Sequence, residues 1–213
     1  HLSTAAALEQ VRLARSRGQI VYAETCPQYL VLTQDCYQSA EPETFVMCPP
    51  LRTQADCDAL WSALTDGTIQ TVGTDHCSFT HAQKIASGLK IGAVPGGCAG
   101  VAQRAQLLYS YGVSKGRITP KQFVSLLSSK PAQIYGIPER GCIAPGMIAD
   151  LVIWDPETRT TLTHENHLHA CDRSPYAGMQ LVGGARTVFL CGEIVADNGS
   201  LIQVGKGQYL VRI

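Results

Sequence analysis

The residues most suited to chemistry are Asp75 and His76, which follow an apolar segment that begins near Ile69. This segment has the pattern of a short buried strand. In α/β proteins, ligands and metals commonly bind at the carboxyl ends of such strands. A buried Asp carboxylate is unfavourable unless a cation, a hydrogen bond or a proton compensates its charge. We therefore expect Asp75 to have such a partner.

His1 is the candidate for a metal site shared with Asp75. It lies immediately before a predicted helix, where a strand would just have ended, and Asp75 ends a strand two strand–helix units later. Both side chains would then point from the same rim into one cleft. An imidazole and a carboxylate suit a divalent metal, and the carboxylate can also take a proton from activated water. The alternative is a His in solvent and an Asp that accepts hydrogen bonds from loop amides.

The other potentially reactive side chains give weaker signals. We predict that His76 orients a metal ligand or a substrate group, with a purely structural role as an equal alternative. Cys77 is expected to pack rather than to act as a nucleophile, because the sequence shows no base and orienting group around it. His164, His167 and His169 are spaced so that they could bind a metal, but a solvated or hydrogen-bonded surface is the preferred interpretation.

Composition excludes several classes of function. The chain has 213 residues, 17 basic and 17 acidic side chains, and a formal net charge of zero. No basic stripe indicates nucleic-acid binding, and no apolar run approaches the roughly 18 residues of a membrane span. The nine Cys residues are odd in number, scattered and free of any C-x-x-C pair. This pattern favours a reducing compartment, and we predict a cytoplasmic protein.

Helices and strands are expected to alternate in the first part of the chain. Thr53 can cap one helix, and Gly18 can end another. The expected strands cover residues 19–25 and 69–74, and the expected helices cover about 4–16, 54–64, 101–111, 119–127 and 131–135, with a Gly-rich loop over residues 78–100. This period is typical of a parallel (β/α) barrel.

Composition changes near Gly141, where a segment rich in Val, Ile, Gly and Asp begins. Strand-like runs follow, and Asn198-Gly199 is a strong hairpin-turn signal. We therefore predict two regions, an α/β part over residues 1–140 and a β domain segment over residues 141–213. The chain begins with His1 rather than Met. We expect it to be a fragment or a processed product.

The motifs together resemble those of the dihydropyrimidinase/hydantoinase family of cyclic amidohydrolases, and the resemblance covers essentially the whole chain. In chain order these motifs are His1-Leu2-Ser3, Glu24-Thr25-Cys26-Pro27-Gln28-Tyr29-Leu30, Pro49-Pro50-Leu51-Arg52, Leu60-Trp61, Asp66-Gly67, Thr74-Asp75-His76-Cys77, Ala82-Gln83-Lys84, Gly116-Arg117-Ile118 and Ala149-Asp150-Leu151-Val152-Ile153-Trp154-Asp155. Each motif alone is weak evidence for the family, but the occurrence of all of them in the family's order is specific.

The resemblance implies the C-terminal part of a TIM (β/α)8 barrel, followed by part of a small β-sandwich. Family members are about twice as long and hold a centre of two zinc-type ions. His1 matches the late-barrel His ligand, and Asp75 matches the Asp ligand that also serves as general base. The early His-x-His pair, a bridging carbamylated Lys and a preceding His ligand belong to the half that this chain lacks. The family also implies a homo-oligomer, usually a tetramer.

The resemblance further implies that the cyclic substrate is bound through the backbone of two loops, at Cys48 and at Gly96. Both loops depart from the family pattern. Cys48 stands where Ser is common, Gly96 stands where the family often has Asn, and Ala102 stands where it often has Glu. Backbone contacts can survive these changes, although a more flexible loop weakens them.

The resulting hypothesis is a hydrolase that opens the amide C–N bond of a cyclic ureide or imide of the hydantoin or dihydropyrimidine type. It would use a metal-activated hydroxide, with Asp75 as general base and acid. The fragment alone is expected to be inactive. The alternatives are a non-catalytic scaffold protein related to dihydropyrimidinases, or a degenerate gene fragment. Because such scaffolds lose metal ligands, His1 and Asp75 favour the enzyme.

Overall fold

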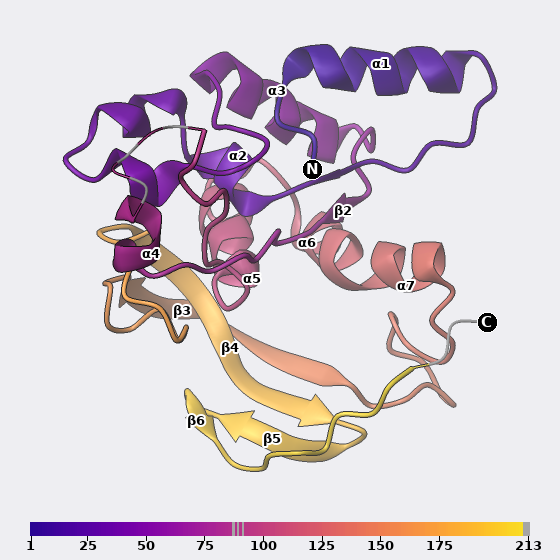
Figure 1. The fold of residues 1–213 in the computed structure, drawn as a ribbon. Coiled ribbons are helices and arrows are strands. Elements are labelled where there is room, and N and C mark those ends of the chain that lie inside the picture. The colour runs from indigo at the N-terminus through magenta and orange to yellow at the C-terminus, as the bar shows by residue number, and fades with distance from the viewer. Residues whose placement is uncertain (87, 89, 91, 211–213) are drawn as a thin grey trace.

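The computed structural model describes residues 1–86, 88, 90 and 92–210. Three residues of the predicted Gly-rich loop (87, 89 and 91) and the last three of the predicted β segment (211–213) lie outside the described residues. Figure 1 shows the helices gathered on one side and an antiparallel sheet on the other. The predicted combination of an α/β part with a β segment is confirmed.

The α/β part is built on two parallel strands, β1 (Glu24–Thr25) and β2 (Thr71–Val72), with Glu24 opposite Thr71. They are the carboxyl ends of the predicted strands over residues 19–25 and 69–74. The remainder of each predicted strand forms no ladder among the described residues. Helix α1 (Ala5–Ser16) precedes β1 and helix α3 (Gln54–Thr65) precedes β2. This is the helix–strand alternation of a parallel α/β unit.

Caps explain why the two long helices begin where they do. The Thr4 side chain accepts a hydrogen bond from the Ala7 amide and begins α1. Thr53 begins α3 with a capping box, in which the Thr53 side chain accepts from the Asp56 amide and the Asp56 carboxylate accepts from the Thr53 amide. Each cap satisfies amide donors that the first helical turn leaves free. The predicted starts of both helices are therefore confirmed.

Short helical turns fill the connection between β1 and α3. They are α2 (Pro27–Val31), η1 (Gln34–Gln38) and η2 (Pro42–Phe45). The core packs α1, α2, α3 and the later helix α5 (Arg104–Leu108) around the two strands. Fully buried side chains at its centre include Leu8, Leu60, Ile69 and Leu107.

The predicted loop over residues 78–100 contains a helix that the sequence interpretation missed. Helix α4 (His81–Ile85) begins with a capping box between Thr80 and Gln83. The S/T-x-x-Q spacing that specifies this start is present in the sequence. The segment at Cys98 lies beside the end of β2, because His76 and Cys98 form a parallel bridge.

Two helices predicted to be separated near residue 128 form one continuous segment. It comprises α6 (Pro120–Val124), the π-helical turn η4 (Ser125–Ser129) and α7 (Lys130–Tyr135). Pro131 cannot donate a backbone hydrogen bond, so it usually kinks or ends a helix. Here the wider turn precedes it, and the helix continues. A similar π-helical turn, η3 (Tyr109–Val113), extends α5.

The antiparallel sheet has the strand order β3-β4-β5-β6. Its strands are β3 (Leu151–Thr161), β4 (Gln180–Leu190), β5 (Glu193–Asp197) and β6 (Ser200–Leu201). Asn198 and Gly199 both have positive φ, 46° and 77°, and connect β5 to β6. The predicted hairpin turn is therefore confirmed. None of the helices in the described ranges has the length and apolarity that crossing a membrane requires.

Candidate functional site

His1 is held at the carboxyl end of β1 by backbone contacts of its neighbour Leu2. The Leu2 amide donates to the Glu24 carbonyl at 2.8 Å, and the Thr25 hydroxyl donates to the Leu2 carbonyl at 2.7 Å. The first residues therefore run beside β1. This placement brings His1 to the rim formed by β1 and β2.

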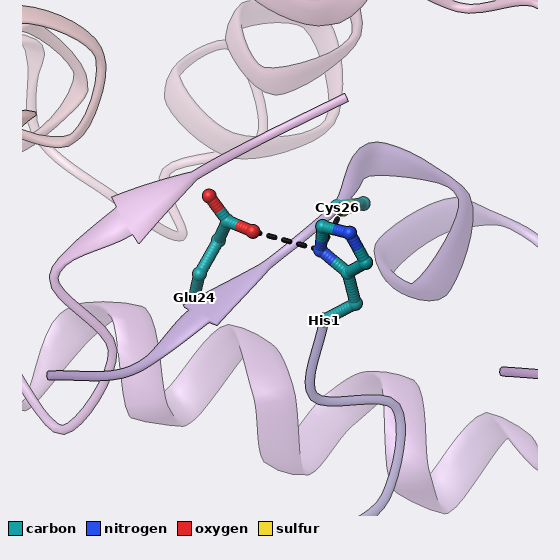
Figure 2. A group of neighbouring side chains, drawn as sticks. All are labelled: His1, Glu24 and Cys26. Carbon is teal, nitrogen blue, oxygen red and sulfur yellow. Dashed lines mark hydrogen bonds and ion pairs between the residues drawn. The ribbon is translucent and has the colours of Figure 1, made fainter. Parts of the chain in front are cut away.

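The His1 imidazole lies between two carboxylates. Its Nδ1 atom is 2.7 Å from Glu24 Oε1, and its Nε2 atom is 3.4 Å from Asp75 Oδ1. Figure 2 shows the ring facing Glu24 of β1, with Cys26 beside it. The two side chains predicted to share a metal are therefore neighbours in space. Both remain partly accessible, His1 at 38% and Asp75 at 29% of the side chain.

Asp75 has a backbone conformation that few side chains adopt. Its φ is 48°, in the left-handed region, which Asp tolerates better than most residues. The preceding residue, Thr74, is held by two hydrogen bonds. The Gln28 side chain donates to the Thr74 carbonyl at 3.3 Å, and the Thr74 hydroxyl accepts from the His76 amide at 3.2 Å. The chain therefore turns sharply after β2 and directs the Asp75 carboxylate toward His1.

Glu24 is a site residue that the sequence interpretation missed. Burial raises the pKa of its carboxyl group, and the neighbouring Asp75 adds to this, while the N-terminal ammonium and Arg104 act in the opposite direction. Gly73 on the adjacent strand makes room for Glu24, because a Cβ atom there would lie 2.7 Å from its carboxylate. The available signal was its position, since Glu24 lies near the carboxyl end of one predicted strand and Asp75 directly follows the other.

The donor set fits a divalent metal. His1, Glu24 and Cys26 offer ligand atoms within 4.8 Å of one another. Burial, followed by the Glu24 charge, raises the pKa of the Cys26 thiol far above its usual range, which disfavours its thiolate form. Metal-binding His residues commonly donate their second ring N–H to a carboxylate. With Nδ1 directed at Glu24, His1 has Nε2 free to bind a metal together with Asp75.

The two predicted substrate-binding positions, Cys48 and Gly96, lie against each other. A Cβ atom on Gly96 would lie 3.8 Å from the Cys48 amide nitrogen. The loops are joined by a hydrogen bond of 3.0 Å from the Gly97 amide to the Val46 carbonyl. The Tyr29 hydroxyl donates to the Pro49 carbonyl at 2.9 Å and so anchors the loop that contains Cys48. Both positions are exposed at the surface.

His76 contacts the Gly-rich loop. Its Nδ1 atom accepts a hydrogen bond of 3.1 Å from the Gly100 amide, and the His76 backbone pairs with Cys98. Its ring lies 4.9 Å from the ring of His169. Its contacts therefore connect the end of β2 to the predicted substrate loop. The predicted role of His76, which is to orient a metal ligand or a substrate group, stays a prediction.

The predicted histidine surface is mostly hydrogen-bonded. The His164 ring accepts from the Ser174 amide at 3.1 Å, and the His169 ring is 2.8 Å from the Gln103 side-chain oxygen. Burial, followed by the charges of His76 and His167, lowers the pKa of His169. His167 differs from the prediction of a solvated or hydrogen-bonded surface, because it is only 1% exposed and its Nδ1 atom has no hydrogen-bond partner among the described residues.

A second group of possible metal ligands consists of Glu41, Glu43 and His81. Its charge is already balanced in part, because the Arg173 guanidinium contacts both oxygens of Glu41, at 2.9 and 3.2 Å. The Arg173 hydrogen bond lowers the pKa of Glu41. An ion-pair network explains this group better than a metal centre.

The chain is similar in sequence and structure to several known proteins. The Amidohydrolase family model matches residues 1–195. A D-phenylhydantoinase of Escherichia coli is 41% identical over the whole chain, which covers 47% of that protein. The D-hydantoinase structure of Bacillus sp. AR9 superposes with a TM-score of 0.96 at 40% identity, over 100% of this chain and 47% of that one.

A dihydropyrimidinase structure from Brevibacillus agri superposes with a TM-score of 0.92 at 39% identity, over 95% of this chain and 45% of that one. The chain therefore spans about half the length of the relatives it matches. The family model alone covers far more than half of the 213 residues. The chain belongs to the amidohydrolase family.

Proposed function

We propose that the protein carrying this chain is a metal-dependent hydrolase that opens the amide C–N bond of a cyclic ureide or imide, of the hydantoin or dihydropyrimidine type. One observation carries the proposal. His1 Nε2 and Asp75 Oδ1 lie 3.4 Å apart, beside the parallel pair of β1 and β2. The names of the relatives, D-phenylhydantoinase and dihydropyrimidinase, support the substrate class.

His1 and Asp75 would hold the metal, and Glu24 would fix the orientation of the His1 ring. When bound, the metal would supply Lewis acidity, which polarises a ring carbonyl and lowers the pKa of water. Asp75 has the role of the proton carrier. Its carboxylate takes a proton from the attacking water and delivers it to the ring nitrogen that leaves.

Cys48 and Gly96 would bind the ring through their backbone groups. Their exposure and mutual contact support this assignment. We place the end of the barrel part at residue 140 and the start of the β-sandwich segment at residue 141. The finer expectations are also proposals: two zinc ions per complete site, a bridging carbamylated Lys from outside these residues, a homotetramer, and a cytoplasmic location.

Residues 1–213 alone would not turn over substrate, because His1 and Asp75 are only part of the proposed ligand set. The decisive experiment therefore uses the protein at its full natural length. Metal content and hydrolysis of hydantoin and dihydrouracil would be measured on the same preparation. We expect bound divalent metal and ring opening. A folded protein with neither would contradict the proposal and favour a non-catalytic scaffold or a degenerate product.

A further inference from the structure

We propose that Lys84 is a positioning residue that sets the separation of the two loops that bind the cyclic substrate. This inference rests on the proposed function, since it assigns a role within the same site. The two loops are the segment that ends at Cys48 and the Gly-rich segment that contains Gly96. Lys84 belongs to neither loop and comes from helix α4.

The Lys84 ammonium group bridges the two loops directly. Its Nζ atom donates to the Val46 carbonyl at 2.7 Å and to the Gly97 carbonyl at 2.7 Å. Val46 lies two residues before Cys48, and Gly97 directly follows Gly96. The ammonium therefore contacts the backbone immediately beside both predicted substrate positions.

The bridge reinforces a contact that already joins the loops. The Val46 carbonyl accepts from the Gly97 amide at 3.0 Å as well as from Lys84. Gly97 also lies tightly against Cys77, because a Cβ atom there would be 2.7 Å from the Cys77 carbonyl oxygen. Its φ of 148° lies within the range that side chains disfavour. Only a glycine suits this position, and Lys84 binds the carbonyl of that same residue.

The burial of Lys84 is unusual for a lysine. The residue is 4% exposed, and the salt bridges found in the described part of the chain do not include it. Removing an ammonium from water is unfavourable unless its donors are satisfied. Burial accordingly lowers the pKa of Lys84. Two carbonyl acceptors and the face of Phe79, whose ring centre is 5.7 Å away, compensate the charge. Such a costly arrangement is expected where it holds functional backbone in place.

Helix α4 fixes the base of the lysine side chain. The capping box between Thr80 and Gln83 defines the start of this helix, and the Lys84 amide donates to the Thr80 carbonyl at 3.1 Å. The aliphatic part of Lys84 then reaches inward, with its ammonium at the junction of the loops. The helix that the sequence interpretation missed therefore acts as the support for the substrate loops.

The test compares Lys84→Met with Lys84→Arg in the protein at its full natural length. Met keeps the length and removes the donors, whereas Arg keeps the charge and can still reach a carbonyl. Hydrogen bonds to charged groups contribute about 1.5–3 kcal/mol, so we expect Lys84→Met to raise KM by about 10- to 100-fold. We expect a smaller change in kcat and no change in metal content. The KM of Lys84→Arg should lie between those of wild type and Lys84→Met.

Lys121→Met is the matched control, because Lys121 is exposed on α6. Amide hydrogen exchange at Gly97 gives a readout that does not depend on turnover, and we expect at least about tenfold faster exchange in Lys84→Met. If Lys84→Met does not fold, the same two measurements on Lys84→Arg test the inference. We then expect a KM above that of wild type, by less than the rise expected for Lys84→Met, and amide exchange at Gly97 faster than in wild type. Unchanged KM and unchanged Gly97 exchange would overturn the inference. A wild-type protein without ring opening would instead contradict the proposed function.

Discussion

The Nε2 atom of His1 lies 3.4 Å from the Oδ1 atom of Asp75, although the two residues are 74 positions apart in the chain. The opposite ring nitrogen of His1 is already occupied by Glu24, at 2.7 Å. The ring is thus oriented before any metal binds. This relationship defines the proposed centre.

Asp75→Asn removes the proton acceptor of the proposed reaction while keeping the size of the side chain. General acid–base catalysis typically contributes about 100- to 10,000-fold, so we expect kcat to fall by an amount in this range. Asp58→Asn is the control, because Asp58 is exposed on α3. Steady-state hydrolysis of hydantoin measures the effect. Turnover within about twofold of wild type in Asp75→Asn would exclude Asp75 as the proton carrier.

Glu24→Gln weakens the hydrogen bond that orients His1. Removing such a carboxylate partner typically reduces metal affinity by about 10- to 100-fold, and we expect a loss of this size. Competition with a chelator measures the zinc dissociation constant. Glu9→Gln, an exposed change on α1, provides the comparison. Equal affinities in the two variants would mean that Glu24 does not support the metal ligand.

Gly73→Ala tests the same support from the neighbouring strand. The added Cβ atom would lie 2.7 Å from the Glu24 carboxylate, which would have to move. We expect the zinc affinity to fall as in Glu24→Gln, by about 10-fold or more. Gly92→Ala is a suitable control, since a Cβ atom there would meet nothing within 4 Å. A Gly73→Ala protein with normal zinc affinity would show that the position of Glu24 is unimportant.

Asp56 links the starts of α1 and α3 and gives a pH-dependent contribution to stability. Burial raises the pKa of Asp56, but hydrogen bonds from Thr53 and from the Ala5 amide outweigh this effect, so that the net pKa is lowered. A carboxyl group with a lowered pKa in the folded state stabilises the protein above its unfolded pKa of about 3.9. That stabilisation is lost as the pH falls through the folded value.

Asp56→Ala should therefore reduce the free energy of unfolding by about 1 kcal/mol at neutral pH, the usual contribution of a helix cap. The difference from wild type should shrink as the pH falls below about 4. Urea unfolding at several pH values measures both. A difference that stays constant on acidification would show that the charged form of Asp56 is not responsible.

Several features could be predicted because neighbouring residues specify them. Thr53 and the turn at Asn198-Gly199 act through local hydrogen bonds and backbone preferences, so their structures followed from the sequence. Asp75 was recognised because it ends an apolar strand, and its proximity to His1 followed from the parallel α/β pattern. The roles of His1, Asp75, Cys48 and Gly96 remain predictions that rest on their placement.

Other features depend on partners that are distant along the chain. Glu24 could have been a surface carboxylate, and its position against His1 depends on the backbone pairing of Leu2 with β1. Lys84 has the residue type least expected in an interior. Its two carbonyl partners lie in separate loops, and carbonyl groups leave no trace in the residue types. Pro131 suggested a break that a π-helical turn instead accommodates.

The most direct test of the central claim is anomalous X-ray diffraction at the zinc edge, on crystals of the full-length protein loaded with zinc. We expect an anomalous peak within bonding distance of both His1 Nε2 and Asp75, with Glu24 on the opposite ring nitrogen of His1. A metal bound elsewhere, with neither His1 nor Asp75 among its ligands, would contradict this claim.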